Sequence, residues 1–112
     1  MVPSPAPFDK SLQDPLVDFG FEQLTVAGSS VGFTAATFGG AGIGRPALSA
    51  TFLVETAPIR FTLDGATTPT SAVGQLANVG DIYIVWGSLN IQNFRAIRTT
   101  GTSALLDVTY AR

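Results

Sequence analysis

The sequence predicts an all-β fold: a single small antiparallel β-sandwich or jelly-roll-like barrel with an extended Pro-rich N-terminal arm. Roughly seven or eight short runs of strand-forming residues recur at spacings of about 8 to 12 residues, with turn-forming residues between them. Helical periodicity is nearly absent, because the two helical candidates, residues 72–77 and 90–94, are short and poorly capped. A chain of 112 residues is long enough for one core. We therefore expect an arm over residues 1–16 and a β-sandwich domain over residues 17–112.

Proline dominates the start of the chain. Four of the seven prolines fall within the first 15 residues, at Pro3, Pro5, Pro7 and Pro15. Proline fixes φ and donates no backbone hydrogen bond, so this segment is expected to be extended, with polyproline character. Two interpretations stay open: a frayed terminus, or an arm that lies along a neighbouring subunit. The second would exploit the small conformational entropy that a Pro-rich segment loses on ordering.

The first half of the domain holds strand patterns on either side of a Gly-rich loop. Residues 21–26 alternate weakly and end at a Gly/Ser turn. Residues 31–38 are expected to form a strand pair or one strand bent at Gly32, and residues 39–46 a loop. Residues 48–55 alternate more strongly, which predicts a strand with one shared face. The residues on that face are Leu48, Ala50, Phe52 and Val54.

The second half of the domain contains the clearest strand patterns. Residues 59–63 alternate strictly and are closed by Asp64-Gly65, a pair that favours a turn with positive φ. Residues 82–86 are β-branched and aromatic and stop at a Gly-Ser pair. The weaker elements are a short edge piece at 72–76, a turn at 78–81, a strand over 91–97 and a last strand over 104–110. In the last strand, Leu106, Val108 and Tyr110 lie opposite Leu105, Asp107 and Thr109.

Charge is scarce along the whole chain. Six basic and eight acidic residues, 14 in all, make up 12% of the sequence, against about 25% in an ordinary soluble domain. The surface is therefore either neutral and rich in hydroxyl groups or buried against partners. The net charge is −2 and the basic residues form no block, so we expect no nucleic-acid partner. No apolar run reaches the roughly 18 residues of a membrane span, and the N-terminus does not resemble a signal peptide. We expect no membrane partner either.

The usual catalytic and metal-binding residues are few. Cysteine and histidine are both absent, which excludes thiol nucleophiles, zinc fingers and His-dependent hydrolases. Residues 39–44 lack the Lys and Ser/Thr of a phosphate-binding loop, so a mobile or partner-contacting loop is expected there. Asp64, Asp81 and Asp107, with Glu55 next, are the candidates for carboxylate catalysis. Because the first two stand in turns, we expect them to bond the backbone, and we expect no catalytic, cofactor or metal site.

The alternation of side chains along the strands predicts where the large aromatic residues lie. Trp86 shares a face with Ile82 and Ile84, which predicts a core position, and Tyr83 lies on the opposite face. Tyr110, near the end of the last strand, is expected at a sheet edge with its hydroxyl in water.

The arginines are expected to be partnered because charge is so scarce. A default partner is an acid such as Glu55 or Asp107, and the alternative is an acid across an interface. Together with the arm, they form the predicted contact set. The candidate partner-contact residues are Pro3, Pro5, Pro7, Phe8, Arg45, Arg60, Arg95 and Arg98.

Five segments of the second half resemble small accessory structural proteins of tailed-bacteriophage virions. They are VETAPIRFTLDG at residues 54–65, TPT at 68–70, GD at 80–81, NFRAIR at 93–98 and LDVTY at 106–110. The resemblance covers roughly residues 50–112 and contains no catalytic motif. Proteins of this kind look like short β-sandwiches that attach to the virion.

The resemblance implies a non-enzymatic virion structural protein, a capsid decoration or cement subunit that binds the assembled shell and stabilises it. The implied partners are the major capsid protein or other virion proteins, together with further copies in a small homo-oligomer, a trimer being favoured. The implied location is the outer capsid surface, after assembly in the host cytoplasm. The alternative is a neck, tail or fibre-associated structural or glycan-binding module, in which Tyr83 or Tyr110 would be exposed.

Overall fold

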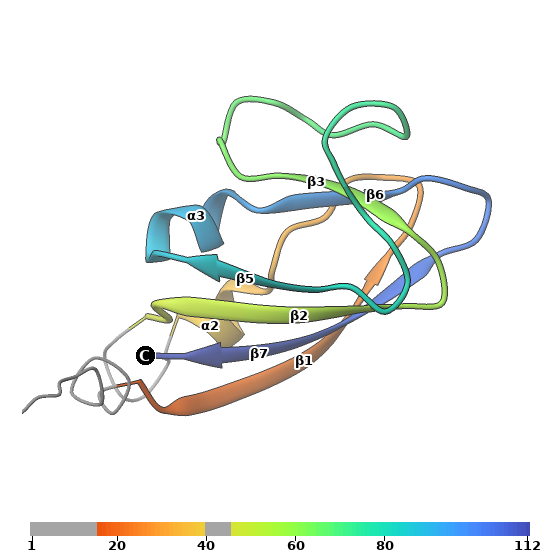
Figure 1. Ribbon diagram of the computed structural model, residues 1–112. Helices are drawn as coiled ribbons and strands as arrows, with labels where there is room; N and C mark the ends of the chain where they lie inside the picture. The colour runs from red at the N-terminus through yellow and green to blue at the C-terminus, as the bar shows by residue number, and fades with distance from the viewer. Residues whose placement is uncertain (1–15, 40–45) are drawn as a thin grey trace, which may run out of the picture.

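The computed structural model describes residues 16–39 and 46–112, and these form two antiparallel sheets that pack against each other (Figure 1). The larger sheet has the strand order β1-β7-β2-β5, and the smaller sheet has the order β4-β3-β6. This confirms the predicted small all-β sandwich. The strands are β1 (Asp18–Val26), β2 (Ser49–Glu55), β3 (Ile59–Thr62), β4 (Gln75–Ala77), β5 (Ile82–Trp86), β6 (Arg95–Arg98) and β7 (Ala104–Ala111). Two short helices, α2 (Ala35–Phe38) and α3 (Ser88–Asn93), complete the described elements.

Several predicted features lie outside the described residues. They are the arm up to residue 15, with Pro3, Pro5, Pro7 and Phe8, and residues 40–45 of the Gly-rich loop, with Arg45.

Alternation sets the core face of the larger sheet. β2 pairs with β7 from Ser49↔Ala111 to Glu55↔Leu105, and β7 pairs on its other side with β1. Even-numbered residues of these strands turn inward, because successive side chains alternate between faces. This confirms both predicted faces except at Leu48, which precedes β2 and is 44% exposed. The buried inward residues are Leu24, Val26, Ala50, Phe52, Val54, Ala104, Leu106, Val108 and Tyr110.

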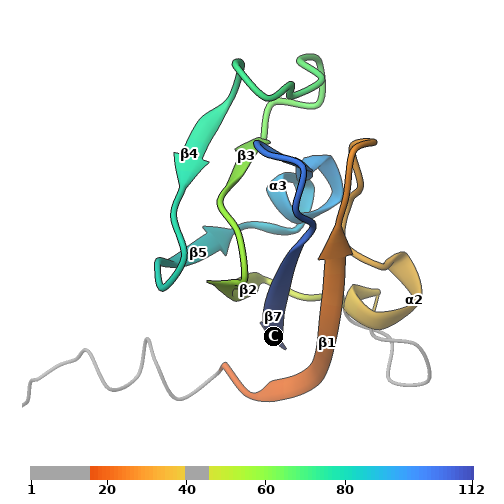
Figure 2. The same cartoon turned by 90° about the vertical axis from the view of Figure 1, so that its right-hand side faces the viewer.

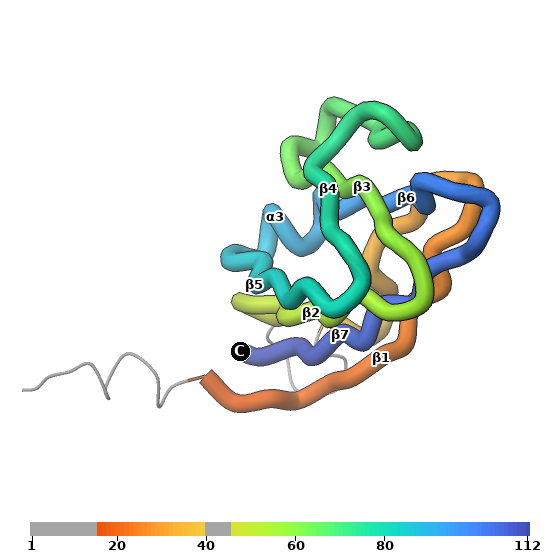
Figure 3. Tube along the Cα trace, turned by 45° about the vertical axis from the view of Figure 1, so that its right-hand side comes forward, coloured from red at the N-terminus to blue at the C-terminus, as the bar shows by residue number. Residues whose placement is uncertain are grey.

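The smaller sheet is built on β3, which pairs with β4 on one side and with β6 on the other. Ile59 and Phe61 are buried, as the strict alternation predicts, and Gly65 then turns the chain at φ 73°. In Figure 3 the chain beyond β3 rises as a green loop and returns along β3 as β4. The second predicted turn, at residues 78–81, has Gly80 at φ 91° and leads into β5.

Aromatic rings join the two sheets. Phe52 of β2 meets Phe61 of β3 edge to face, with ring centroids 5.5 Å apart. Phe33 stacks on Phe94 at 3.9 Å and meets Tyr110 edge to face at 5.7 Å. All five side chains are buried. Buried aromatic pairs contribute about 0.5–1.5 kcal/mol each beyond the area they bury, so this cluster fixes how the sheets face each other.

The strand predicted at residues 31–38 is wrong. This segment makes one isolated bridge, Val31↔Ala96, and then forms α2, which lies beside β1 (Figure 2). Glu22 of β1 accepts hydrogen bonds from the Thr34 N–H at 3.0 Å and from its hydroxyl at 2.6 Å. These bonds hold the start of α2 to a side chain of the sheet, so the chain bends instead of extending.

α3 forms where the sequence predicted a strand and rejected a helix. Gly87, at φ 96°, ends β5 and redirects the chain into α3 (Figure 2). Asn90 donates from Nδ2 to the Trp86 carbonyl at 2.9 Å, and Ile91 is buried with 1% exposure. Tertiary packing therefore outweighs the weak caps, as it does for most short helices. The strand predicted at 91–97 is shortened to β6.

Candidate interaction surface

β5 presents large apolar side chains to the outside. Ile82, Ile84 and Trp86 share one face, as the sequence predicts, but they are 64%, 52% and 57% exposed. The predicted core position of Trp86 is therefore wrong. The surface formed by these three side chains is termed the β5 face below.

The inward position of Tyr83 accounts for this reversal. Its ring stacks on Phe52 with centroids 5.6 Å apart and meets Phe61 at 5.3 Å, while Val85 is buried beside it. The Tyr83 hydroxyl donates to the Leu76 carbonyl at 3.3 Å. Both faces of the sequence IYIVW are apolar, so alternation separates the faces without indicating which one is buried.

Across the larger sheet, the outer face changes from apolar to polar. β2 places Ser49, Thr51 and Leu53 beside the three residues of the β5 face. On β7, the residue opposite Leu53 is Asp107, which accepts a hydrogen bond from Gln23 of β1 at 2.9 Å. The outer face is thus apolar at the β5 end of the sheet, and Phe21 of β1, 60% exposed at the opposite end, is a further apolar residue on it.

Two carboxylates meet on this polar part of the face. Glu55 of β2 and Asp107 of β7 are diagonal neighbours in the sheet. A hydrogen bond with Asp107, and then the charge of Asp107, raise the pKa of Glu55 above its ordinary value of 4.5. The sequence offered Asp107 among its first candidates and Glu55 after it, but only the pairing register of two strands far apart in the chain brings them together.

Two of the three first carboxylate candidates, Asp64 and Asp81, serve turns. Asp64 accepts hydrogen bonds from the Ala66 N–H at 3.0 Å, the Thr67 N–H at 2.8 Å and the Thr67 hydroxyl at 2.7 Å. These bonds, with those from Thr67 largest, lower the pKa of Asp64 below its ordinary value of 3.8. Asp81 accepts from the Asn78 N–H at 2.8 Å. Both residues bond turn backbone, as the sequence predicts, and the hypothesis that they form a catalytic pair is dropped.

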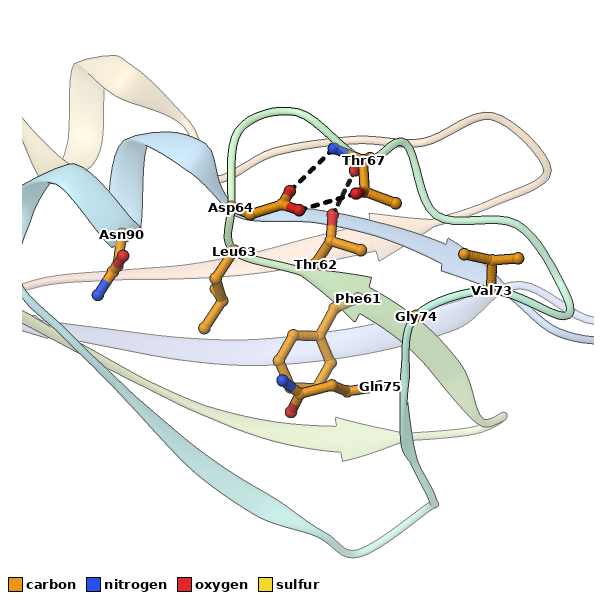
Figure 4. Close-up of a pocket in the computed structure, with 9 residues that line it drawn as sticks. All are labelled: Phe61, Thr62, Leu63, Asp64, Thr67, Val73, Gly74, Gln75 and Asn90. Atoms are coloured by element: carbon orange, nitrogen blue, oxygen red, sulfur yellow. Dashed lines mark hydrogen bonds between the residues drawn. The ribbon is translucent and has the colours of Figure 1, made fainter.

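A cavity of about 410 Å³ lies beside the Asp64 turn (Figure 4). Phe61, Leu63 and Val73 supply apolar side chains, and Asp64 is the ionisable residue among those that line it. Figure 4 shows the Asp64 carboxylate directed at Thr67, with both oxygens bonded there. This hollow therefore offers apolar walls and neutral polar groups, and its carboxylate is committed to its own turn.

The arginines bond their own chain. Arg60 donates from Nε to the Ser71 carbonyl at 3.1 Å and from Nη1 to the Gly74 carbonyl at 2.9 Å. Arg95 donates to the Phe94 carbonyl at 2.8 Å, and Arg98 reaches the Ser103 hydroxyl at 3.4 Å. In the described part of the chain, these three groups donate to carbonyl and hydroxyl oxygens, so the expected pairing with Glu55 or Asp107 is wrong.

Tyr110 is also placed differently from its prediction. It is fully buried, and its hydroxyl donates to the Glu22 carboxylate, which also holds Thr34. Burial, and then the Glu22 carboxylate, raise the pKa of the Tyr110 hydroxyl well above its ordinary value of 10.0. Tyr110 is therefore part of a structural network and not the exposed platform that a glycan site on this residue requires.

Comparison with protein-family models, with curated proteins and with solved structures finds no match for this chain. Over residues 16–39 and 46–112, no group of three or more Asp, Glu, His or Cys side chains is arranged to hold a metal ion. The helices described there are too short to cross a membrane.

Proposed function

We propose that this protein is a non-enzymatic virion structural protein, a capsid decoration or cement subunit that binds an assembled shell. Support comes from two sources that do not depend on each other. One is the resemblance of residues 50–112 to accessory proteins of tailed phages, and the other is the exposed β5 face. The alternative is attachment at the neck, tail or fibre of the particle.

The β5 face is the observation that carries the proposal. Single exposed apolar residues are common on soluble proteins, but three in consecutive positions on one face form a contiguous patch. The patch includes a half-exposed Trp, a residue type enriched where proteins bind each other. With 14 charged residues in 112, the chain has little charge with which to keep such a surface hydrated. A binding partner that covers the β5 face would remove this cost.

The function needs binding and no chemistry. A subunit that binds the assembled lattice, and not its separated parts, stabilises the lattice by mass action, by about 2.7 kcal/mol per site at a free concentration 100-fold above Kd. The committed carboxylates of Asp64 and Asp81 fit a protein of this kind, because they are used to hold loops in place. The predicted contacts through Pro3, Pro5, Pro7, Phe8 and Arg45 remain part of the proposal.

The test is the position of the protein on the particle of the phage that encodes it. We expect gold-labelled antibody and averaged images to find it in many copies on the outer shell. Heads assembled without it should release DNA at a lower temperature, and adding the purified protein should restore the release temperature. Absence from purified particles, or presence at the tail tip alone, would overturn the decoration proposal.

A further inference from the structure

The free edge of β5 is a second feature of the strand that carries the β5 face. Among the strands of residues 16–39 and 46–112, β5 stands at the end of the larger sheet, so one side pairs with β2 and the other side pairs with no described strand. The backbone bonds that flank this pairing run from Gly87 N to Leu48 O at 2.7 Å and from Val54 N to Asp81 O at 3.1 Å. In an antiparallel ladder, residue pairs that exchange hydrogen bonds alternate with pairs whose N–H and C=O groups point away from each other.

This alternation assigns the backbone groups of every β5 residue. The backbone groups of Asp81 and Gly87 bond to β2. Tyr83 and Val85 occupy the alternate positions between them, so their backbone groups bond to β2 as well. The backbone groups that point to the free edge belong to Ile82, Ile84 and Trp86. The Asn90 side chain, which lies beyond the strand, reaches the Trp86 carbonyl, in agreement with this assignment. The three residues of the β5 face thus also present the outward backbone of the edge.

The other ends of the two sheets are protected against pairing. β1 carries Asp18 and Glu22 and has an irregular register near its start. β4 is only three residues long. β6 carries Arg95 and Arg98 and is bridged by Val31. Charge, irregularity, shortness and coverage are the means by which natural edges avoid pairing with other chains. β5, with the sequence IYIVW, has no charge, no proline and no glycine.

We propose that β5 pairs with β5 of a second copy of this chain, antiparallel and centred on Ile84. Two four-stranded sheets then become one continuous sheet. Ile84 lies opposite Ile84 of the partner subunit, and Ile82 lies opposite Trp86 of the partner subunit. In this register the outward N–H groups of Ile82, Ile84 and Trp86 and the carbonyls of Ile82 and Ile84 gain partners, because the centre is itself a residue that points outward. The Trp86 carbonyl, which already accepts from Asn90, would accept a second bond. The inference goes beyond the proposed virion role, since it concerns the isolated protein.

Charge and symmetry favour a second copy as the occupant. In this register Asp81 lies opposite Gly87 of the partner subunit, so no like charges meet at the edge. Each side offers the same apolar residues, which is the self-complementarity that a two-fold contact requires. Each copy has one such edge, so the contact closes as a dimer. The expected trimer would need a separate, heterologous contact.

The size of the contact sets the expected affinity. Edge pairing buries the outward backbone groups and the flanks of Ile82, Ile84 and Trp86 that meet across the axis, while the outer surfaces of these side chains stay on the face of the continuous sheet. The buried area is therefore below the roughly 1,200 Å² at which standard specific interfaces begin, in the range of weak contacts. We expect a dissociation constant of roughly 10 µM.

Sedimentation of the full-length chain over roughly 1 to 200 µM tests the proposal. The wild type is expected to pass from monomer to dimer, and Ile84→Lys to stay monomeric, because two lysines would meet at the axis. Phe21→Lys is the matched control. It places the same charge on the same outer face, at a 60% exposed apolar residue of β1, and is expected to dimerise like the wild type. Near-ultraviolet circular dichroism and the melting temperature verify that all variants are folded.

A mixture of two variants tests the register. Ile84→Lys and Ile84→Glu are each expected to be monomeric, and an equimolar mixture is expected to form dimers, since opposite charges then meet at the axis. A monomeric wild type, a trimer, a dimeric Ile84→Lys variant or a mixture that stays monomeric would each overturn the proposal. So would loss of the dimer on removal of residues 1–15, which would make that segment the occupant. None of these results changes where the protein lies on a particle, so the two proposals fail separately.

Discussion

At the scale of single residues, a network of the buried Tyr110, the half-buried Glu22 and the exposed Thr34 ties the larger sheet to α2. The Tyr110 hydroxyl donates to a carboxylate that already accepts two bonds from Thr34. We expect Tyr110→Phe to lower the free energy of unfolding by about 2 kcal/mol, the usual loss for a hydrogen bond to a charged group. Urea denaturation measures it. Tyr83→Phe is the control and should cost less than about 1 kcal/mol, because its hydroxyl bond is long and exposed. Equal losses in the two variants would contradict the special role of Tyr110.

The same tyrosine makes stability depend on alkaline pH. Its pKa is raised in the folded state, so above the ordinary value of 10.0 the unfolded chain releases a proton that the folded chain keeps. The stabilising contribution is fully present below pH 10 and is lost as pH rises beyond it. We expect the melting temperature of the wild type to fall more steeply above pH 10 than that of Tyr110→Phe. Parallel curves for the two proteins would show that Tyr110 titrates normally.

The Glu55 and Asp107 pair predicts an effect at the acidic end. The pKa of Glu55 is raised in the folded chain, so protonation of Glu55 favours the folded state. This stabilising contribution is fully present below about pH 4.5 and is lost as pH rises through the folded-state pKa. At neutral pH two carboxylates are left as neighbours. Glu55→Gln keeps a donor for Asp107 and removes one charge, so we expect a higher melting temperature than the wild type at pH 7 and a shrinking difference below pH 4.5. A gain that is the same at both pH values would point to another cause.

At the scale of elements, the turns that join strands depend on particular glycines. Gly65 combines φ 73° with close packing, since an added Cβ would lie 2.9 Å from Asn93 Cγ. Gly80 has φ 91° in open space, and an added Cβ at Gly101 would meet nothing within 4 Å. We expect Gly65→Ala to cost more than Gly80→Ala, which should cost about 1 kcal/mol, and Gly101→Ala to be neutral or slightly stabilising. Chemical denaturation of the three variants gives the order, and an equal loss at Gly65 and Gly80 would contradict the packing at Asn93.

The strand patterns show what sequence reasoning can and cannot supply. β2, β3 and β7 were predicted with their faces because one face of each is apolar and the other carries polar residues. β5 was predicted as a strand with its faces reversed, because both of its faces are apolar and only Tyr83 packing on Phe52 decides between them. α3 depends on Ile91 reaching the core, a contact that local propensity does not contain. The sequence therefore predicts that the residues of the β5 face, the main candidate surface, share one side of a strand. It does not predict that this side is the exposed one.

At the scale of the whole molecule, the structure shows how the few charged residues are used. The acidic groups described above are largely used within the chain: Asp64 and Asp81 hold turns, and Glu22 holds Tyr110 and Thr34. Arg60, Arg95 and Arg98 bond carbonyl and hydroxyl oxygens of the chain itself. On the outer face of the larger sheet the acidic residues Glu55 and Asp107 lie on β2 and β7, whereas the β5 end carries three exposed apolar side chains. A molecule of this kind is suited to having that end covered by another protein.

Trp86 makes this whole-molecule property measurable, because it is the single tryptophan of the chain. It is 57% exposed, so in dilute solution its fluorescence should resemble that of tryptophan in water and be readily quenched by acrylamide. When a partner covers the β5 face, the indole leaves water, and we expect the emission to move to shorter wavelength and the quenching constant to fall severalfold. Pairing of two β5 edges leaves the outer face of the continuous sheet in water, so dimerisation alone should change the Trp86 emission only slightly, and the full change is expected on binding to the proposed shell. Weak quenching in the dilute wild type would mean that Trp86 is already covered within the monomer, and the β5 face would then not be the binding surface.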